Sequence, residues 1–272
     1  MAERTKLNEG KTKIIWSDPK RTDRVIIQSK DDITAGNGAR HDLIEGKGAL
    51  SNSTTCDCFE LLESKNMLTH FAGRVDKTSF LAKRADMILI ECVARRRAAG
   101  SYLKRNQNVD SGARFSDLEI EFYFKDNDMG DPLMVHDFVR RRIMLFNAGV
   151  PLNAGLISEL PLEEPHKLYP RISKLRHFVE RVFSIIETAW AYQKVELIDL
   201  KIECGFVGTS YPEIVVADVI DNDSWRIWPW GDKSQEKSKQ VYRDAPKVTP
   251  EVLAQVRANY AWVAERTAKF LE

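Results

Sequence analysis

Two acidic side chains in the last third of the sequence have the spacing of a metal site. Glu203 lies in the segment ELIDLKIECGF and Asp218 in EIVVADVIDND, with the turn-forming segment VGTSYP between the two. If the segments pair as an antiparallel hairpin, residues whose numbers sum to about 421 lie opposite each other, and Glu203 falls near Asp218. Opposed carboxylates repel, so the arrangement needs a cation. Mg²⁺ fits best, because it is usually held by one or two carboxylates together with substrate phosphates.

The same spacing has a simpler explanation. Strict alternation in ELIDLKIECGF predicts one polar face, formed by Asp199, Lys201 and Glu203, and strands with one buried face routinely turn such residues to solvent. The predicted core face carries Ile198, Leu200, Ile202, Cys204 and Phe206. Lys201 could add a positive charge for phosphates. Spacing alone leaves the metal site and the solvated sheet face equally open.

A second candidate site lies in EGKTK near the N-terminus. Gly10 allows close approach of the backbone, and Lys11 and Lys13 alternate onto one face of a predicted strand. Such a pattern could cover nucleotide phosphates, although it is not the GxxxxGK-Ser/Thr pattern of a P-loop. The alternative is a pair of solvated lysines at a sheet edge.

Basic residues cluster in ARRRAAGSYLKR around a turn of small residues at positions 98–101. They are Arg95, Arg96, Arg97, Lys104 and Arg105. A phosphate pocket suits them, because arginine forks bind oxyanions and Ser101 can donate as well. A basic surface face is the alternative. Nucleic acid suits them less well, since Tyr102 is the only interleaved aromatic residue.

Two polar segments complete the candidates. The segment DNDSWRIWPWGDKSQEKSKQVYRD holds three tryptophans among many charges, which is typical of binding loops, and offers Arg226, Lys239 and Arg243 for anion contacts. The segment FKDNDMGDP adds Lys125 and Asp131 in a predicted turn. No nucleophile signature such as GxSxG or HExxH occurs, which favours a reaction performed by positioning and charge neutralisation, as in phosphoryl transfer.

Hydrophobic periodicity predicts the elements that must position these residues. We expect strands in residues 6–30, a helix at about 46–65 and a buried strand at 87–93. Apolar stripes predict two long helices, RHFVERVFSIIETAWAYQ and EVLAQVRANYAWVAERTAKFL, the second after Pro250 at a helix start. The Asp- and Gly-rich segment SKDDITAGNGAR predicts a loop.

Composition restricts the class of protein. A chain of 272 residues with 43% hydrophobic and 30% charged residues is typical of an ordered globular protein, here expected to have two lobes. With 41 basic against 40 acidic residues, we expect no nucleic-acid or membrane partner. The absence of a long apolar segment predicts a cytoplasmic location. The four cysteines lack zinc-site spacing and are expected to be buried free thiols.

Six segments, in order and over nearly the whole chain, resemble the family of phosphoribosylaminoimidazole-succinocarboxamide (SAICAR) synthetases of purine biosynthesis. They are EGKTKIIW, SKDDITAGNGAR, MILIECVARRRAAGSYLKR, FYFKDNDMGDPL, LIDLKIECGF and ADVIDNDSWRIWPWGDKSQEKSKQVYRD. The resemblance is closest to the animal-type enzyme, in VIDNDSWR and WVAER. It implies an ATP-dependent ligase that requires Mg²⁺ and joins L-aspartate to carboxyaminoimidazole ribonucleotide, giving SAICAR, ADP and phosphate.

The resemblance also implies the fold and the roles of residues. The expected fold is α+β, with a small kinase-like antiparallel sheet lobe (1–88) over ATP, a larger ATP-grasp-like and substrate-binding lobe (89–272), and the ATP cleft between them. Residues expected around ATP are Gly10, Lys11, Lys13, Met87, Lys201, Glu203 and Asp218, of which Glu203 and Asp218 would hold Mg²⁺. Those expected around the ribonucleotide are Arg95, Ser101, Arg226, Lys239 and Arg243. Lys201, Lys125 and Asp131 are the expected catalytic residues.

The chain departs from the family in two respects. Cys204 stands where the family usually has Phe in a KxEFG strand, which changes packing on the core face and leaves the polar face intact. Animal-type synthetases are generally fused to an aminoimidazole ribonucleotide carboxylase domain, so this shorter chain is expected to be monofunctional, and a homodimer is left open. Two rival functions are a kinase of related fold, which would use ATP without L-aspartate, and a nucleic-acid binder that uses ARRRAAGSYLKR. The sequence singles out no residue for binding aspartate and no general base.

Overall fold

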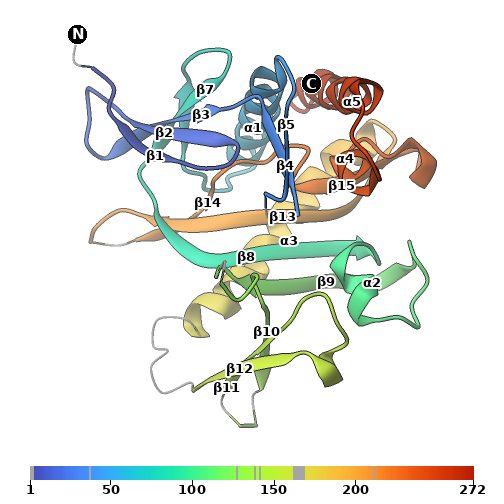
Figure 1. The fold of residues 1–272 in the computed structure, drawn as a ribbon. Coiled ribbons are helices and arrows are strands. Elements are labelled where there is room, and N and C mark those ends of the chain that lie inside the picture. Colours follow the sequence, from blue (N-terminus) through green and yellow to red (C-terminus); the bar gives the residue numbers. More distant parts are fainter. Residues whose placement is uncertain are drawn as a thin grey trace.

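The computed structural model describes residues 3–36, 38–126, 128–137, 139–140, 142–161, 169–210 and 212–272. Within these residues the chain forms antiparallel sheets of five, eight and two strands, with helices packed against them (Figure 1). This mixed architecture confirms the predicted α+β class. The boundary at residue 88 stays a prediction.

The five-stranded sheet belongs to the N-terminal part and has the order β1-β2-β3-β7-β6. Its strands are β1 (Lys6–Glu9), β2 (Lys13–Ser17), β3 (Arg24–Ser29), β6 (Phe71–Arg74) and β7 (Ser79–Lys83). Helix α1 (Lys47–Ser64) packs its buried residues, among them Phe59 and Leu62, into one core with Ile27 and Phe80 of this sheet. The predicted strands at 6–30 and the predicted helix at 46–65 are confirmed.

The prediction of a loop for SKDDITAGNGAR is wrong. Strands β4 (Asp32–Ala35) and β5 (Arg40–Leu43) pair as a small antiparallel sheet, with residue 37 of their connection outside the described part of the chain. Ile33 is fully buried in a cluster with Tyr242 and Tyr260, from the opposite end of the sequence. Burial of this side chain against distant residues outweighs a local composition that favours turns.

The eight-stranded sheet has the order β12-β11-β10-β9-β8-β13-β14, and β15 also pairs with β13. Its strands are β8 (Asp86–Arg97), β9 (Arg114–Phe124), β10 (Leu133–Asp137), β11 (Arg142–Phe146), β12 (Leu156–Pro161), β13 (Val195–Val207), β14 (Glu213–Ala217) and β15 (Trp225–Pro229). Helix α3 (Tyr169–Tyr192) crosses this sheet and buries Val179, Val182 and Phe183 in the core (Figure 1). The strand predicted at 87–93 is the first part of β8, which continues through Arg95–Arg97.

The other helical segments are α2 (Ser101–Arg105), α4 (Gln240–Asp244), α5 (Pro250–Thr267) and the 3-10 turns Leu152–Ala154 and Lys233–Gln235. Thr249 caps α5 by accepting from the Val252 amide at 3.4 Å, and Pro250 opens the helix as predicted. Helix α5 lies beside α1 near the C-terminus (Figure 1). Within the described residues no helix is long and apolar enough to cross a membrane.

Strand β13 departs from the predicted alternation at one position. Its pairing with β15 shifts register between Leu197 and Asp199, and Ile198 packs with Ala99 and Trp228 apart from the main core. The two acids of the predicted polar face are not solvated, since Asp199 is 4% and Glu203 7% exposed, whereas the Lys201 side chain is 37% exposed. β13 lies between β8 and the strands β14 and β15, and most of its residues are buried on both faces.

The four cysteines are free and buried, as predicted. Cys204 is fully buried in the main core, where Cys92 of the adjacent strand β8 is its neighbour. Two small thiols therefore occupy the space near the position where a phenylalanine was expected.

Candidate active site

A cavity of about 240 Å³ is lined by residues of both larger sheets. Its walls are the turn between β1 and β2, the start of α1, the middle of β13, the segment that follows β14, and Tyr260 of α5. The charged residues that line it are Lys11, Lys13, Lys47, Lys201, Glu203, Asp218, Asp221 and Asp223. The cavity therefore gathers two predicted groups, the N-terminal lysines and the acidic strand pair.

The hairpin register differs by one residue from the predicted pairing of Glu203 with Asp218, although both side chains line the cavity. Strands β13 and β14 pair with Glu203 opposite Ala217, so Asp218 is the next residue after the paired position. Asp218 has a φ of +63°, a left-handed conformation that is uncommon for a residue with a side chain. Its carbonyl oxygen accepts a hydrogen bond from Nε2 of the buried His70 at 3.1 Å. His70 thus supports the backbone at the turn that carries the acid.

Lysines surround both carboxylates. Lys13 Nζ forms an ion pair with Asp218, and Lys125 Nζ donates to Glu203 Oε2 at 2.7 Å. Lys201 Nζ lies 3.1 Å from Glu91 Oε1 and 3.8 Å from Glu203 Oε1. Burial would raise the pKa of Asp218, but the charge of Lys13 outweighs it and lowers that pKa. Removal from water would lower the pKa of Lys201, but Glu91 and Glu203 raise it above its usual value.

The donor set fits a hard cation that also takes ligands from a substrate. Among the described residues no group of three or more His, Cys, Asp or Glu side chains is arranged to hold a metal. Glu203 and Asp218 supply carboxylate oxygens to one cavity, and lysines beside them suit phosphate oxygens. Mg²⁺ typically keeps waters and phosphates beside one or two protein carboxylates, so the residues present are compatible with it.

Of the other residues expected around ATP, Gly10 lies in the turn beside this cavity and Met87 lies outside its lining. The Gly10 amide donates to the Lys13 carbonyl at 2.9 Å, which closes the β1–β2 turn and leaves Lys11 and Lys13 on the cavity wall. A Cβ at Gly10 would meet its nearest neighbour only at 3.8 Å, so the structure shows no close backbone approach there. Met87 pairs with Gly205 and is 37% exposed, outside the cavity lining.

Asp131 also lies outside the cavity lining and has a structural partner. Its Oδ1 accepts from the Asp126 amide at 3.0 Å, and its own amide donates to the Asp126 carbonyl at 3.0 Å. These two bonds close the loop that follows β9 and holds Lys125 at its first position. Asp131 therefore stabilises the loop that begins with Lys125.

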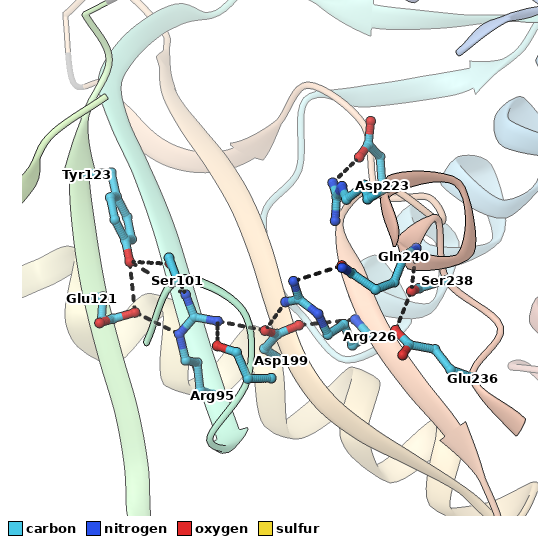
Figure 2. A network of polar contacts seen from close by, with 12 residues as sticks. Arg95, Ser101, Glu121, Tyr123, Asp199, Asp223, Arg226, Glu236, Ser238 and Gln240 are labelled. Atoms are coloured by element: carbon cyan, nitrogen blue, oxygen red, sulfur yellow. Dashed lines mark hydrogen bonds and ion pairs between the residues drawn. The ribbon is translucent and has the colours of Figure 1, made fainter. Parts of the chain in front are cut away.

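A buried network of ion pairs lies further along β8 and β13 (Figure 2). Arg95 is 4% exposed, and its Nε donates to Glu121 Oε2 and its Nη1 to Asp199 Oδ2, both at 2.7 Å. Asp199 also accepts from Arg226, through Nη1 at 2.6 Å and the backbone amide at 3.1 Å. Burial opposes the charge on Arg95, but Asp199 and Glu121 raise its pKa. The four residues form a continuous charged chain.

Ser101 and Gly100 join this network at the start of α2. Arg95 Nη2 donates to Ser101 Oγ at 3.2 Å (Figure 2). Gly100 has a φ of +58°, and a Cβ there would lie 2.7 Å from Arg226 Nη2. The absence of a side chain at position 100 therefore lets the Arg226 guanidinium rest against the backbone beside Ser101.

Asp223 holds the other two predicted anion-binding residues. Its carboxylate accepts from Lys239 Nζ and from Arg243 Nη2, each at 2.5 Å. Burial would raise the pKa of Asp223, but these two cations outweigh it and lower that pKa. Gln240 follows Lys239 in the chain, and its Oε1 accepts from Arg226 Nη2 at 3.1 Å, so the two groups lie next to each other (Figure 2). The structure thus brings all five predicted ribonucleotide residues into two adjoining groups.

The remaining basic residues of ARRRAAGSYLKR do not join these groups as anion ligands. Arg96 pairs with Glu187 of α3 at 2.7 Å, and Arg97 pairs with Glu196 at 2.8 Å. Arg105 forms an ion pair with the buried Glu121. These arginines hold elements of the protein together, whereas Lys104 is exposed, so the cluster as a whole is neither a solvated basic face nor one phosphate pocket.

Sequence reasoning missed Lys47, His70 and Glu121. A lysine within a predicted helix normally faces solvent, whereas Lys47 is 3% exposed. The signal available was GKG at positions 46–48, where two glycines leave little bulk around one cation. His70 and Glu121 carry no local signal, because their partners lie 148 and 26 positions away.

Comparison with known proteins gives consistent matches. A family model described as SAICAR synthetase matches residues 6–258. The bifunctional phosphoribosylaminoimidazole carboxylase/succinocarboxamide synthetase of Homo sapiens is 42% identical over 267 residues, which are 98% of this chain and 59% of that protein. The chain therefore spans about three fifths of the length of such animal relatives. The phosphoribosylaminoimidazole-succinocarboxamide synthase of Roseiflexus sp. (strain RS-1) is 44% identical, with 96% of each chain covered.

Solved structures agree in fold. Phosphoribosylaminoimidazole-succinocarboxamide synthase from Ehrlichia chaffeensis superposes with a TM-score of 0.79 at 26% identity, covering 97% of this chain and 98% of that one. A SAICAR synthetase in complex with ADP gives a TM-score of 0.77 at 25% identity, with 97% of each chain covered. The similarity confirms the predicted fold, with its small antiparallel sheet lobe and larger lobe.

Proposed function

The chain belongs to the SAICAR synthetase family, and from this premise we propose that it joins L-aspartate to the carboxylate of carboxyaminoimidazole ribonucleotide. The reaction consumes ATP and gives SAICAR, ADP and phosphate. The observation that carries the proposal is the common strand β13, which presents Lys201 and Glu203 to the lysine-lined cavity and Asp199 to the arginine network. One rigid element thus places a nucleotide site beside an anion site, as transfer between two bound substrates requires.

ATP would occupy the cavity, with its phosphates near Lys11, Lys13 and Lys201. Glu203 and Asp218 would hold Mg²⁺ there, and the ion would neutralise phosphate charge. Lys13 forms an ion pair with Asp218 and Lys125 forms one with Glu203, so each lysine stands where it can contact a phosphate oxygen instead. Gly10 would shape the turn above the phosphates, and Met87, at the start of β8, would contact adenine.

The ribonucleotide phosphate would bind among Ser101, Arg226, Lys239 and Arg243. Arg95 has a different role in this proposal, because its guanidinium is buried and donates to Glu121, Asp199 and Ser101. It positions Ser101 and, through Asp199, Arg226. A guanidinium that is already fully engaged can fix its neighbours without contacting the ligand itself.

The chemical step follows from these positions. A substrate carboxylate oxygen attacks the γ-phosphorus while the bond to the ADP oxygen breaks, which gives an acyl phosphate. The aspartate amine then attacks the carbonyl carbon, and phosphate leaves with the oxygen that came from the carboxylate. Lys201 and Lys125 would neutralise the developing charge, and Asp131 would position Lys125 through its loop.

Two measurements test the proposal. ADP release is expected to require both L-aspartate and the ribonucleotide, whereas a kinase of related fold would release ADP without L-aspartate. With ¹⁸O in the substrate carboxylate, we expect one labelled oxygen in the phosphate. Turnover without that transfer would refute the acyl phosphate. A homodimer remains a separate prediction, which the molar mass in solution decides.

A further inference from the structure

Lys47 is a buried cation in the cavity that the proposed roles leave unassigned. It is the first residue of α1, lines the cavity, and is 3% exposed. The Asp31 carboxylate fixes the backbone on both sides of it by accepting from the Gly46 amide at 3.1 Å and the Gly48 amide at 2.8 Å. A Cβ at Gly48 would come within 2.7 Å of the Ser29 carbonyl, so the helix start is pressed against the end of β3. The direction of the Lys47 side chain is therefore set by the fold.

The ammonium group of Lys47 has little compensation for its charge. Its Nζ donates to the Lys30 carbonyl at 3.3 Å and lies 5.4 Å from the centroid of the Tyr260 ring. Across the described part of the chain no carboxylate comes within 4.0 Å of it, whereas Lys13 and Lys201 in the same cavity each have one. Burial is the main cause that lowers the pKa of Lys47, and the more distant Asp221 and Asp223 oppose the shift only in part.

A buried cation without a counter-ion is costly, and an anionic ligand in the cavity would supply the missing partner. The phosphates of both nucleotides already have proposed cations in Lys11, Lys13 and Lys201 and in the group around Arg226. The two carboxylates of the amino acid substrate have none. We propose that Lys47 binds a carboxylate of L-aspartate, an inference that rests on the proposed function. The Tyr260 ring would close this subsite on one side.

The test replaces Lys47 by methionine, which keeps the length of the side chain and removes the charge. We expect the KM for L-aspartate to rise roughly 10- to 100-fold, the range of a lost charge-assisted hydrogen bond, with the KM values for ATP and the ribonucleotide unchanged. Lys47→Arg should recover part of the affinity, because it restores a cation. Lys77→Met, at an exposed lysine, is the matched control and should change nothing.

Substrate preference gives a readout that a purely structural role would not alter. The wild-type enzyme should prefer L-aspartate to its two monoamides, L-asparagine and L-isoasparagine. In Lys47→Met the preference for L-aspartate over one of these monoamides should fall. The amide group of that monoamide replaces the carboxylate that Lys47 binds. An unchanged KM for L-aspartate, or a rise confined to ATP or the ribonucleotide, would overturn the inference.

Folding and the proposed function are controlled separately. Thermal unfolding should show Lys47→Met folded, since the change removes an uncompensated buried charge. If it does not fold, Lys47→Gln keeps a donor for the Lys30 carbonyl and undergoes the same assays. Wild-type ADP release that is independent of L-aspartate would refute the proposed function, whereas an L-aspartate-dependent wild type with an unaffected Lys47→Met refutes only the role of Lys47.

Discussion

Strand β13 carries two charged regions, the arginine network and the lysine cavity, whose side chains differ in their exposure to solvent. In the arginine network the side chains of Arg95, Asp199 and Glu121 are 4%, 5% and 7% exposed, and each bonds to another member. In the lysine cavity Lys47 is 3% exposed, but the side chains of Lys201 and Lys13, which pair with carboxylates, are 37% and 22% exposed. Only a few residues along the same strand separate the two regions.

The difference in exposure follows from the shapes of the two kinds of cation, the arginine guanidinium and the lysine ammonium group. A guanidinium offers five N–H donors in a planar fork and can satisfy several buried carboxylates at once, which makes a closed network. An ammonium group is a compact charge on a flexible stem, and when part of it meets water it can exchange a carboxylate for a phosphate. We infer that the arginine network maintains the structure and places Ser101 and Arg226, while the lysine cavity changes partners during turnover.

The largest expected effect is a loss of stability when the arginine network is changed. Asp199→Asn leaves Arg95 and Arg226 buried with less negative charge, and losing one partner of a buried ion pair typically costs about 3–5 kcal/mol. Denaturant unfolding should show a loss of this size. The matched change in the cavity, Asp218→Asn, should cost much less stability. Equal losses for the two variants would contradict the distinction between the regions.

The next effect is on turnover. Glu203→Gln and Asp218→Asn remove the proposed metal ligands while keeping shape, and each should lower kcat roughly 100-fold or more, as losses of charge stabilisation at reacting groups do. Both variants should keep the fold and require more Mg²⁺ for half-maximal rate. Glu213→Gln, at an exposed position of β14, is the control. Near-normal activity in both variants would remove the metal assignment.

The acid pair could be predicted from the sequence because its geometry is local. A short turn joins β13 to β14, and the observed register, with Glu203 opposite Ala217, is one residue from the prediction. Helices α3 and α5 followed from their apolar stripes for the same reason. Each depends on neighbours within a few residues, and periodicity reports these directly.

The arginine network could not be predicted from local spacing. Asp199 lies 104 positions from Arg95, and only the completed sheet reveals that it is a partner rather than a solvated acid. The shift of Ile198 out of the main core and the burial of Ile33 between β4 and distant tyrosines have the same origin. Lys47 was missed because the burial of its ammonium group depends on Tyr260, which belongs to a helix more than two hundred positions later.

A smaller effect concerns His70, which supports the backbone of the cavity at Asp218 and is not one of its charged residues. Burial lowers the pKa of His70 to about 4, so the folded protein keeps it neutral while the unfolded chain protonates near pH 6.5. Its stabilising contribution is therefore complete above about pH 6.5 and is lost as the pH falls toward 4. Between pH 7 and pH 5 the wild type should lose about 2 kcal/mol more stability than His70→Gln, which does not titrate.

Paired unfolding curves of these two proteins measure the difference. Glutamine can place an amide donor near the position of Nε2, so His70→Gln should keep the hydrogen bond to the Asp218 carbonyl and most activity at pH 7. His70→Leu removes the donor and should be less active. Identical pH dependence of stability in the wild type and His70→Gln would show that His70 is not held neutral by burial.

The smallest expected effect reports on how the network places its ligand groups. Gly100→Ala puts a Cβ against the Arg226 guanidinium and introduces a side chain at a φ of +58°, so Arg226 must move away from Ser101. We expect the KM for the ribonucleotide to rise about 10-fold, equivalent to about 1.4 kcal/mol, with the KM for ATP unchanged. Gly73→Ala, also at a positive φ but with no atom within 4 Å of the added Cβ, separates backbone strain from displacement of Arg226. If only Gly100→Ala weakens binding of the ribonucleotide, the arginine network influences that binding through the position of Arg226. If both variants weaken ribonucleotide binding equally, backbone strain and not displacement of Arg226 is the cause. If the KM for ATP rises as well, the two regions of β13 are not independent.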